Sequence, residues 1–291
     1  MSPPNKVSVV VPTHNRPQLV AEAVASICAQ TRSPDELIVV DDAETRADDT
    51  LGEVAGCAGV PLRYVTRTGP TGASASRNVG AEMAVGGVLA FCDDDDRWAP
   101  DYLRRAIEAM GDGAVPLVVT WSRYFDGERA APGTSIQPGL GFDDVLATNP
   151  GITGSNIVVR RREYLAIGGF DPDLPVSNDK DFFARWLDEG LAYGVVPEEL
   201  VLRRMHDGER LGTSAGRQLA LRRYEEKWSS RLTRADRRHL RAMAIQAKRA
   251  DTTTTWARLR CTARFLAVAG PRRFQQMREE SRRRDLTYTD P

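Results

Sequence analysis

Four consecutive aspartates, Asp93–Asp96, are the strongest chemical signal in the chain. They follow an apolar run, Val88–Cys92, whose composition predicts a buried strand. Adjacent carboxylates repel one another, so the end of a buried strand would not tolerate them without a compensating cation. Carboxylate oxygens suit Mg²⁺ or Mn²⁺, and Mg²⁺ typically combines one or two carboxylates with substrate phosphates. The alternative, a solvated acidic turn, is less favoured because a buried strand precedes the aspartates and Trp98 follows them.

Polar residues follow two further apolar runs. Asp41 and Asp42 come directly after Leu37–Val40, and Thr13–Arg16 comes shortly after Val7–Val11. In open parallel sheets, ligands bind beyond the carboxyl ends of the strands. We therefore expect these residues and the four aspartates to meet on one rim. Asp41 and Asp42 alone would be a weak signal, because a strand-end aspartate often only caps a loop.

The elements that position these residues are apolar runs, which alternate with segments of helical periodicity. The runs expected to be strands are Val7–Val11, Leu37–Val40, Leu62–Val65, Val88–Cys92 and Leu117–Trp121. A helix is expected after Asn15, which can cap it, with Pro17 in its first turn. Further helices are expected after the Gly69–Gly72 turn and after Pro100. This alternation predicts an α/β fold with a mainly parallel central sheet flanked by helices.

Length and composition narrow the class of protein. The chain has 291 residues, 41% hydrophobic and 27% charged, so it can bury a sizeable core. Its zero net charge argues against a general nucleic-acid binder, and no apolar run approaches the roughly 18 residues of a membrane span. The N-terminus lacks a signal-peptide pattern. The cysteines have no spacing typical of zinc sites or disulfides: Cys28, Cys57, Cys92 and Cys261. We expect a soluble, reduced, cytoplasmic protein.

The charge balance hides an asymmetry. Residues 213–291 carry 20 Lys and Arg against 8 Asp and Glu, a net charge of +12, so residues 1–212 carry −12. We predict a catalytic-type domain over 1–212 and a basic helical C-terminal extension over 213–291. Helices are expected over Arg234–Ala250 and Trp256–Val268. Solvated helical faces are the favoured meaning of the arginines. The alternatives are peripheral contact with the inner face of a membrane, an acidic partner or a second protomer.

Several motifs occur in one order over roughly residues 5–210. They are Val9–Arg16, Ile38–Asp42, Ser76–Gly80, Asp93–Asp96 with Trp98 and Pro100, Gly168–Asp171, and Asn178–Phe182. Together they resemble the family 2 inverting glycosyltransferases (GT2), which have the GT-A nucleotide-diphospho-sugar transferase fold. The resemblance implies transfer of a hexosyl-type sugar from a nucleotide-diphosphate donor to an acceptor hydroxyl. UDP is the expected nucleotide and dTDP the alternative, and the acceptor cannot be inferred.

The resemblance also implies a nucleotide-sugar-binding role for nine residues: Pro12, Thr13, His14, Asn15, Arg16, Asp42, Arg77, Asp93 and Asp94. Pro12 and His14 match positions that touch the base, with His14 stacking on a pyrimidine. Asp42 matches the aspartate that accepts a hydrogen bond from uracil N3, whereas Asp41 braces the loop.

Metal and catalytic roles follow from the same resemblance. Asp95 is the expected ligand of Mg²⁺ or Mn²⁺, and Asp93 or Asp94 reaches the ribose or sugar. His206 matches a histidine that contacts the diphosphate or the metal. Asp179 matches the catalytic base, which takes the acceptor proton during a single displacement.

Two features near the base bear on the acceptor. Asn178 stands where the family usually has a glutamate, and Asp181 points away from Asp179 by about 200° on a helix. The turn Gly168–Asp171 and an expected variable loop over Ser122–Pro150 would shape the acceptor site.

The chain lacks the sequence motifs that other classes of nucleotide-binding protein would carry. A sugar nucleotidyltransferase or a Rossmann dehydrogenase would carry a Gly-rich loop after the first strand, where this chain has Pro12–Asn15. A processive synthase would need membrane helices. A non-catalytic sugar-nucleotide-binding protein remains an alternative, because a sequence cannot demonstrate turnover.

Overall fold

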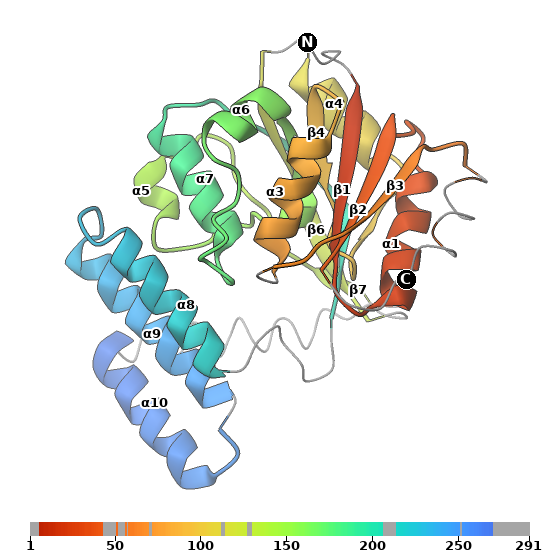
Figure 1. Cartoon of the computed structure of the whole chain (residues 1–291). Helices are drawn as coiled ribbons and strands as arrows, with labels where there is room; N and C mark the ends of the chain where they lie inside the picture. Colours follow the sequence, from red (N-terminus) through yellow and green to blue (C-terminus); the bar gives the residue numbers. More distant parts are fainter. Residues whose placement is uncertain are drawn as a thin grey trace.

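The computed structural model describes residues 6–42, 51, 56, 58–69, 72–111, 114–126, 130–205, 214–250 and 252–269. Its centre is a nine-stranded sheet with helices on both faces (Figure 1). The strands are β1 (Val7–Thr13), β2 (Glu36–Asp41), β3 (Leu62–Thr66), β4 (Val88–Phe91), β5 (Arg97–Trp98), β6 (Leu117–Phe125), β7 (Ala130–Pro132), β8 (Ile157–Arg160) and β9 (Gly194–Arg204).

The first half of the sheet is parallel, as the alternating pattern predicts. Its order is β3-β2-β1-β4, and Val9 pairs with Leu37 on one side and Ala90 on the other. Every residue of β1 is buried, because helices cover both faces of a parallel sheet. The α/β architecture is therefore confirmed, and the carboxyl ends of β1, β2 and β4 lie side by side.

Beyond β4 the sheet is mixed. The order continues β8-β6-β9-β5: β8 is antiparallel to both β4 and β6, β9 is parallel to β6, and β5 is antiparallel to β9. Parts of the expected loop over Ser122–Pro150 are regular structure. β6 extends to Phe125, β7 pairs with it antiparallel, and Phe142–Val145 forms the short helix α5. β8 follows a single 3₁₀ turn, η1 (Gly154–Asn156).

Two layers of helices cover the sheet. The remaining helices are α1 (Pro17–Cys28), α3 (Ala73–Met83), α4 (Tyr102–Met110), α6 (Arg161–Ala166), α7 (Asn178–Asp188), α8 (Ser214–Lys227), α9 (Arg234–Ala250) and α10 (Thr255–Ala269). Apolar side chains of α1 and α4 share a core with Val7, Val9 and Val11 of β1. Val10, which points to the other face, shares a second core with α3, α6 and α7.

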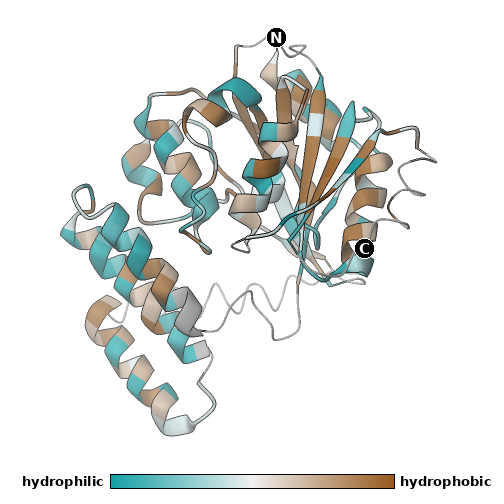
Figure 2. Ribbon diagram, in the orientation of Figure 1, coloured by the Kyte–Doolittle hydropathy of each residue, from teal (hydrophilic) through white to brown (hydrophobic). Residues whose placement is uncertain are grey.

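The C-terminal helices form a bundle beside α7 (Figure 1). The predicted helix Arg234–Ala250 is confirmed with the same bounds, and α10 includes the predicted Trp256–Val268. Tyr224, Trp228 and Leu240 belong to the same core as the aromatic side chains of α7. Figure 2 shows hydrophobic residues along the strands and hydrophilic ones on much of the outer surface of α8 and α9. The C-terminal helices α8 and α9 therefore pack against α7 through an apolar contact.

Candidate active site

The loops after β1, β2 and β4 meet at the carboxyl edge of the parallel strands, as expected. The Thr13 hydroxyl donates a hydrogen bond of 2.9 Å to Asp94 Oδ2, across 81 residues of sequence. His14 Nδ1 lies 2.7 Å from Asp42 Oδ1. We call the carboxylates that gather here, Asp42 and Asp93–Asp96, the acidic rim.

Arg16 places a cation on the acidic rim. Its Nη1 lies 3.1 Å from Asp94 Oδ1 and 2.9 Å from Asp95 Oδ2. Pro17 begins α1 as expected, but the prediction that Asn15 caps this helix is wrong, because Arg16 occupies the N-cap position. Asn15 has a φ of +52°, a left-handed conformation unlike the extended backbone typical of an N-cap. This turn brings Arg16 to the aspartates.

Asp42 connects two loops. Besides facing His14, it accepts a hydrogen bond of 2.6 Å from the backbone nitrogen of Gly72, whose φ of +140° favours glycine. Asp41 instead accepts a hydrogen bond from the Tyr64 hydroxyl within the sheet, which is a bracing position. The His14 side chain is 55% exposed, so its ring is accessible to a planar ligand above Asp42.

Arg77 of α3 is a buried cation beside the rim. It donates a hydrogen bond to Asp93, and its guanidinium carbon lies 5.0 Å from the Phe170 ring centroid. A Cβ at residue 154 would lie 2.5 Å from Arg77 Nη2, so Gly154 permits the close approach of the backbone. Nη1 and Nε of Arg77 have no hydrogen-bond partner among the described residues. Buried unpaired donors cost about 1–3 kcal/mol each, so these two donors of Arg77 favour a ligand with oxygen acceptors.

The carboxylates of the acidic rim repel one another, and burial adds to the cost of ionising them. Burial, together with repulsion from Asp95, raises the pKa of Asp94 to about 6. Burial and the nearby charges of Asp93 and Asp95 raise the pKa of Asp96 to about 8. Asp96 also accepts a hydrogen bond of 3.3 Å from the backbone nitrogen of Arg204. A bound cation would lower these pKa values, because it would favour the ionised carboxylates.

The rim fits a divalent cation that is held partly by substrate. Within the described ranges, no group of three or more His, Cys, Asp or Glu side chains is arranged to hold a metal ion. His206, the other predicted ligand, lies outside the described residues. Mg²⁺ needs only one or two carboxylates when phosphates complete its coordination. Asp95, whose side chain is 13% exposed, and its acidic neighbours provide such carboxylates.

Asp179 is the second residue of α7, at the helix N-terminus where the sequence predicts it. Its Oδ1 accepts a hydrogen bond of 2.7 Å from the Lys180 nitrogen, and Asn149 Nδ2 lies 3.4 Å from its Oδ2. Burial raises the pKa of Asp179 above its ordinary value, and the backbone bond, Arg203 and Arg77 oppose that rise. A carboxylate made more basic in this way suits proton abstraction.

Three residues near the rim were not assigned from the sequence. The Ser155 hydroxyl accepts a hydrogen bond of 2.9 Å from the Asp93 nitrogen. The charge of Arg203, on β9, acts on both Asp96 and Asp179. Paired arginines at the end of a strand were a usable signal for Arg203. Ser155 and Asn149 lie in a segment with no distinctive motif.

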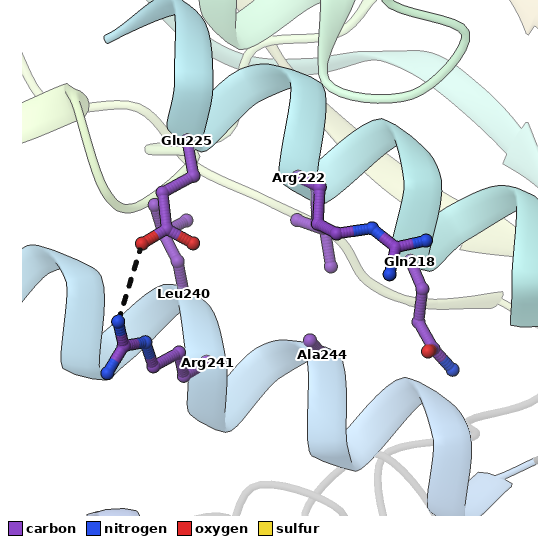
Figure 3. A pocket seen from close by; sticks show the side chains of 7 residues that line it. Gln218, Arg222, Glu225, Leu240, Arg241 and Ala244 are labelled. Atoms are coloured by element: carbon purple, nitrogen blue, oxygen red, sulfur yellow. Dashed lines mark ion pairs between the residues drawn. The ribbon is translucent and has the colours of Figure 1, made fainter. Parts of the chain in front are cut away.

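The structure also holds a cavity of about 180 Å³ between α8 and α9 (Figure 3). Its lining residues all belong to α8 and α9: Gln218, Leu221, Arg222, Glu225, Leu240, Arg241 and Ala244. This cavity is separate from the residues of the acidic rim. Within the described residues, no helix combines the length and the apolar character that crossing a membrane requires.

Residues 8–166 match the family model "Glycosyl transferase family 2". A glucosyl-dolichyl phosphate glucuronosyltransferase of Haloferax volcanii is 30% identical over 186 residues, which cover 60% of this chain and 59% of that protein. The match thus spans less than two thirds of that relative.

Solved structures share the fold. S. aureus TarS 1–349 in complex with UDP-GlcNAc has a TM-score of 0.60 at 17% identity, covering 93% of this chain and 92% of that one. Mannosyltransferase PcManGT from Pyrobaculum calidifontis, in complex with GDP-Man and Mn²⁺, has a TM-score of 0.59 at 21% identity. It covers 95% of this chain and 85% of that one. These likenesses confirm the GT-A fold.

Proposed function

Because the chain belongs to glycosyl transferase family 2, we propose that it transfers a sugar from a nucleotide-diphosphate donor to an acceptor hydroxyl with inversion. The observation that carries the proposal is the acidic rim, which three strand ends assemble beside Asp179 and Arg77. The related structures support a nucleotide-sugar donor, since they hold UDP-GlcNAc and GDP-Man.

UDP is the proposed nucleotide, with dTDP as the alternative. In this proposal His14 stacks on the base, and Asp42 accepts a hydrogen bond from its N3. The short contact between His14 and Asp42 supports a joint role in binding the base, because it orients the exposed ring beside the carboxylate. Pro12 and Thr13 are the last two residues of β1. The left-handed backbone of Asn15 forms the turn that brings Arg16 to the rim.

Asp95 would hold Mg²⁺ or Mn²⁺, with His206 as a second ligand. Such an ion would supply positive charge to the diphosphate as it leaves. Arg16 contacts Asp95 and would have to adjust to the added charge. Asp93 and Asp94 would bind the ribose or the sugar, and the unpaired donors of Arg77 would bind oxygen atoms of the donor.

Asp179 acts as the base. The acceptor oxygen forms a bond to C1 of the sugar while the bond from C1 to the diphosphate oxygen breaks. The hydroxyl proton moves to the Asp179 carboxylate, and the electron pair of the broken bond stays with the diphosphate. One displacement inverts the anomeric centre and needs no nucleophile from the protein. Burial raises the pKa of Asp179 and makes the carboxylate more basic, whereas the N-terminus of α7 favours its ionised form.

A panel of nucleotide sugars tests the proposal. Wild-type protein with Mn²⁺ is incubated with UDP-, dTDP- and GDP-sugars and simple sugar or lipid acceptors, and the released nucleotide is measured. We expect release that depends on one donor class and on an acceptor. Tight donor binding without release from any mixture would favour the non-catalytic alternative.

The C-terminal extension (213–291) is proposed to contact an anionic membrane surface, an acidic partner or a second protomer. Trp256 and Leu259, one helical turn apart on α10, are 80% and 55% exposed. Arg260 and Arg264 are exposed on the same helix. Exposed apolar residues beside arginines are typical of helices that lie on anionic surfaces, and they support peripheral attachment.

A further inference from the structure

The two residues that follow Asp179 are both charged and both buried. Lys180 is 4% exposed and Asp181 is fully buried. Burying a charge costs free energy unless other groups compensate it, so their partners determine whether the first turn of α7 is stable. The partners of both residues include side chains of α8 and the residue that follows it.

Asp181 has three donors. Arg185 Nε, one turn along α7, donates at 2.9 Å. Lys227 Nζ at the end of α8 donates at 2.9 Å, and Trp228 Nε1 donates at 3.0 Å. Two of the three bonds that satisfy this buried carboxylate therefore come from the C-terminal extension. Lys227 also lies 2.5 Å from Asp171, at the turn that precedes α7.

Lys180 contacts the same helix. Its Nζ lies 3.8 Å from the centroid of the Tyr224 ring and 3.4 Å from the Ala147 carbonyl oxygen. The buried Tyr224 hydroxyl donates a hydrogen bond of 2.7 Å to the Leu146 carbonyl. Because the Lys180 backbone nitrogen also binds the Asp179 carboxylate, the contact with Tyr224 bears directly on the orientation of the base.

We propose that Tyr224, Lys227 and Trp228 are positioning residues, which hold the first turn of α7 so that Asp179 faces the acidic rim. The family match ends at residue 166, so it includes neither α7 nor these three residues. The start of the basic extension is thus a working part of the catalytic unit and acts through Lys180 and Asp181. The inference rests on the proposed role of Asp179 as the base.

Matched variants test the inference. Lys227→Met removes the cation and keeps most of the stem, Lys227→Arg keeps the cation, and Trp228→Phe removes only the donor and part of the ring system. Arg231→Met is the control, because it breaks an ion pair of 2.8 Å with Asp188 between the same parts of the chain. Asp188 lies nine residues beyond Asp179, about 13 Å along the helix.

We expect Lys227→Met and Trp228→Phe to lower kcat, per folded molecule, by about 10- to 100-fold, since small misplacements of a catalytic group are costly. The donor KM should stay within about twofold, because these residues lie away from the nucleotide loops. Lys227→Arg should restore most of kcat. Adding Asp181→Asn to Lys227→Met should recover part of the loss, because it removes a buried carboxylate that keeps, among the described residues, only Arg185 as its cation. Losses equal to those of Arg231→Met, or confined to KM, would overturn the inference.

Hydrogen exchange separates this inference from the proposed function. If wild-type protein transfers no sugar, the proposed function fails, but exchange of the α7 amides still reports whether Tyr224, Lys227 and Trp228 hold the first turn of the helix. Exchange of amides 181–184 should then be about tenfold faster in Trp228→Phe and Lys227→Met than in Arg231→Met. Equal exchange in all three variants would contradict the positioning role whatever the activity.

Discussion

The Arg16 guanidinium lies 2.9 Å from the Asp95 carboxylate, so a cation of the chain itself contacts the proposed metal ligand. Asp94 shares the same guanidinium nitrogen at 3.1 Å. A divalent ion that binds Asp95 must compete with this ion pair or displace it. The charge of Asp95 can therefore be offset by Arg16, at the N-cap of α1, or by a divalent ion from solution.

This competition predicts the effect of Arg16→Gln. Without the guanidinium, Asp94 and Asp95 lose a positive charge at about 3 Å, so Mn²⁺ should bind the nucleotide-free variant several-fold more tightly than wild type. Calorimetric titration with Mn²⁺ measures the difference. Unchanged or weaker binding by the variant would mean that Asp95 is not the ligand.

Nucleotide binding should depend on the metal. We expect the UDP affinity measured by calorimetry to fall sharply with EDTA, and to fall similarly in Asp95→Ala with Mn²⁺ present. The control is Asp101→Ala, an exposed carboxylate in the loop that leads into α4, which should bind UDP like wild type. Equal binding in the EDTA, Asp95→Ala and wild-type samples would remove the metal assignment.

The pH dependence of turnover follows from Asp179. The base works only when ionised, and burial raises its pKa above 3.8, so kcat should fall as the pH falls through that raised value. The acidic limb should therefore lie at higher pH than for an exposed aspartate. A pH–rate profile at saturating donor measures it.

The raised pKa of Asp179 also bears on stability. Above this pKa the buried carboxylate is ionised and lowers the free energy of unfolding, so Asp179→Asn should have a higher Tm than wild type at pH 7. A lower Tm would show that the charged carboxylate stabilises the fold.

The basic extension gives a prediction about surfaces. Because Trp256 and Leu259 are exposed beside arginines, the protein should sediment with anionic liposomes at low salt and much less with neutral ones. Trp256→Ala should weaken this binding. Light scattering of the same samples detects a second protomer. If the protein is monomeric and does not bind anionic liposomes, the arginines are explained as solvated helical faces.

Much of the site followed from sequence because it depends on local rules. Val7–Val11, Leu37–Val40 and Val88–Cys92 are apolar runs of strand length, and a parallel arrangement puts the residues after them on one edge. The interpretation of Asn15 as a cap failed because its backbone adopts a left-handed turn, which the residue type permits but does not require. Its neighbour Arg16 caps α1 without a side-chain bond.

The remaining features depend on contacts between distant segments. In the mixed half of the sheet β8 runs antiparallel to its neighbours, and the periodicity of hydrophobic residues does not predict strand direction. The partners of Asp181 come from Lys227 and Trp228, 46 and 47 residues away, so the sequence indicated only that Asp181 differs from Asp179 in direction. Ser155 reaches Asp93 across 62 residues for the same reason.

The central claim is that Asp179 accepts the acceptor proton at a rim that binds a nucleotide sugar. Its most direct test compares wild type with Asp179→Asn, by calorimetry for donor binding and by nucleotide release for transfer. The account predicts donor affinity within about twofold and a transfer rate lower by about 10²–10⁴-fold, because only the proton acceptor is removed. Near-normal transfer by the folded Asp179→Asn variant would contradict the account.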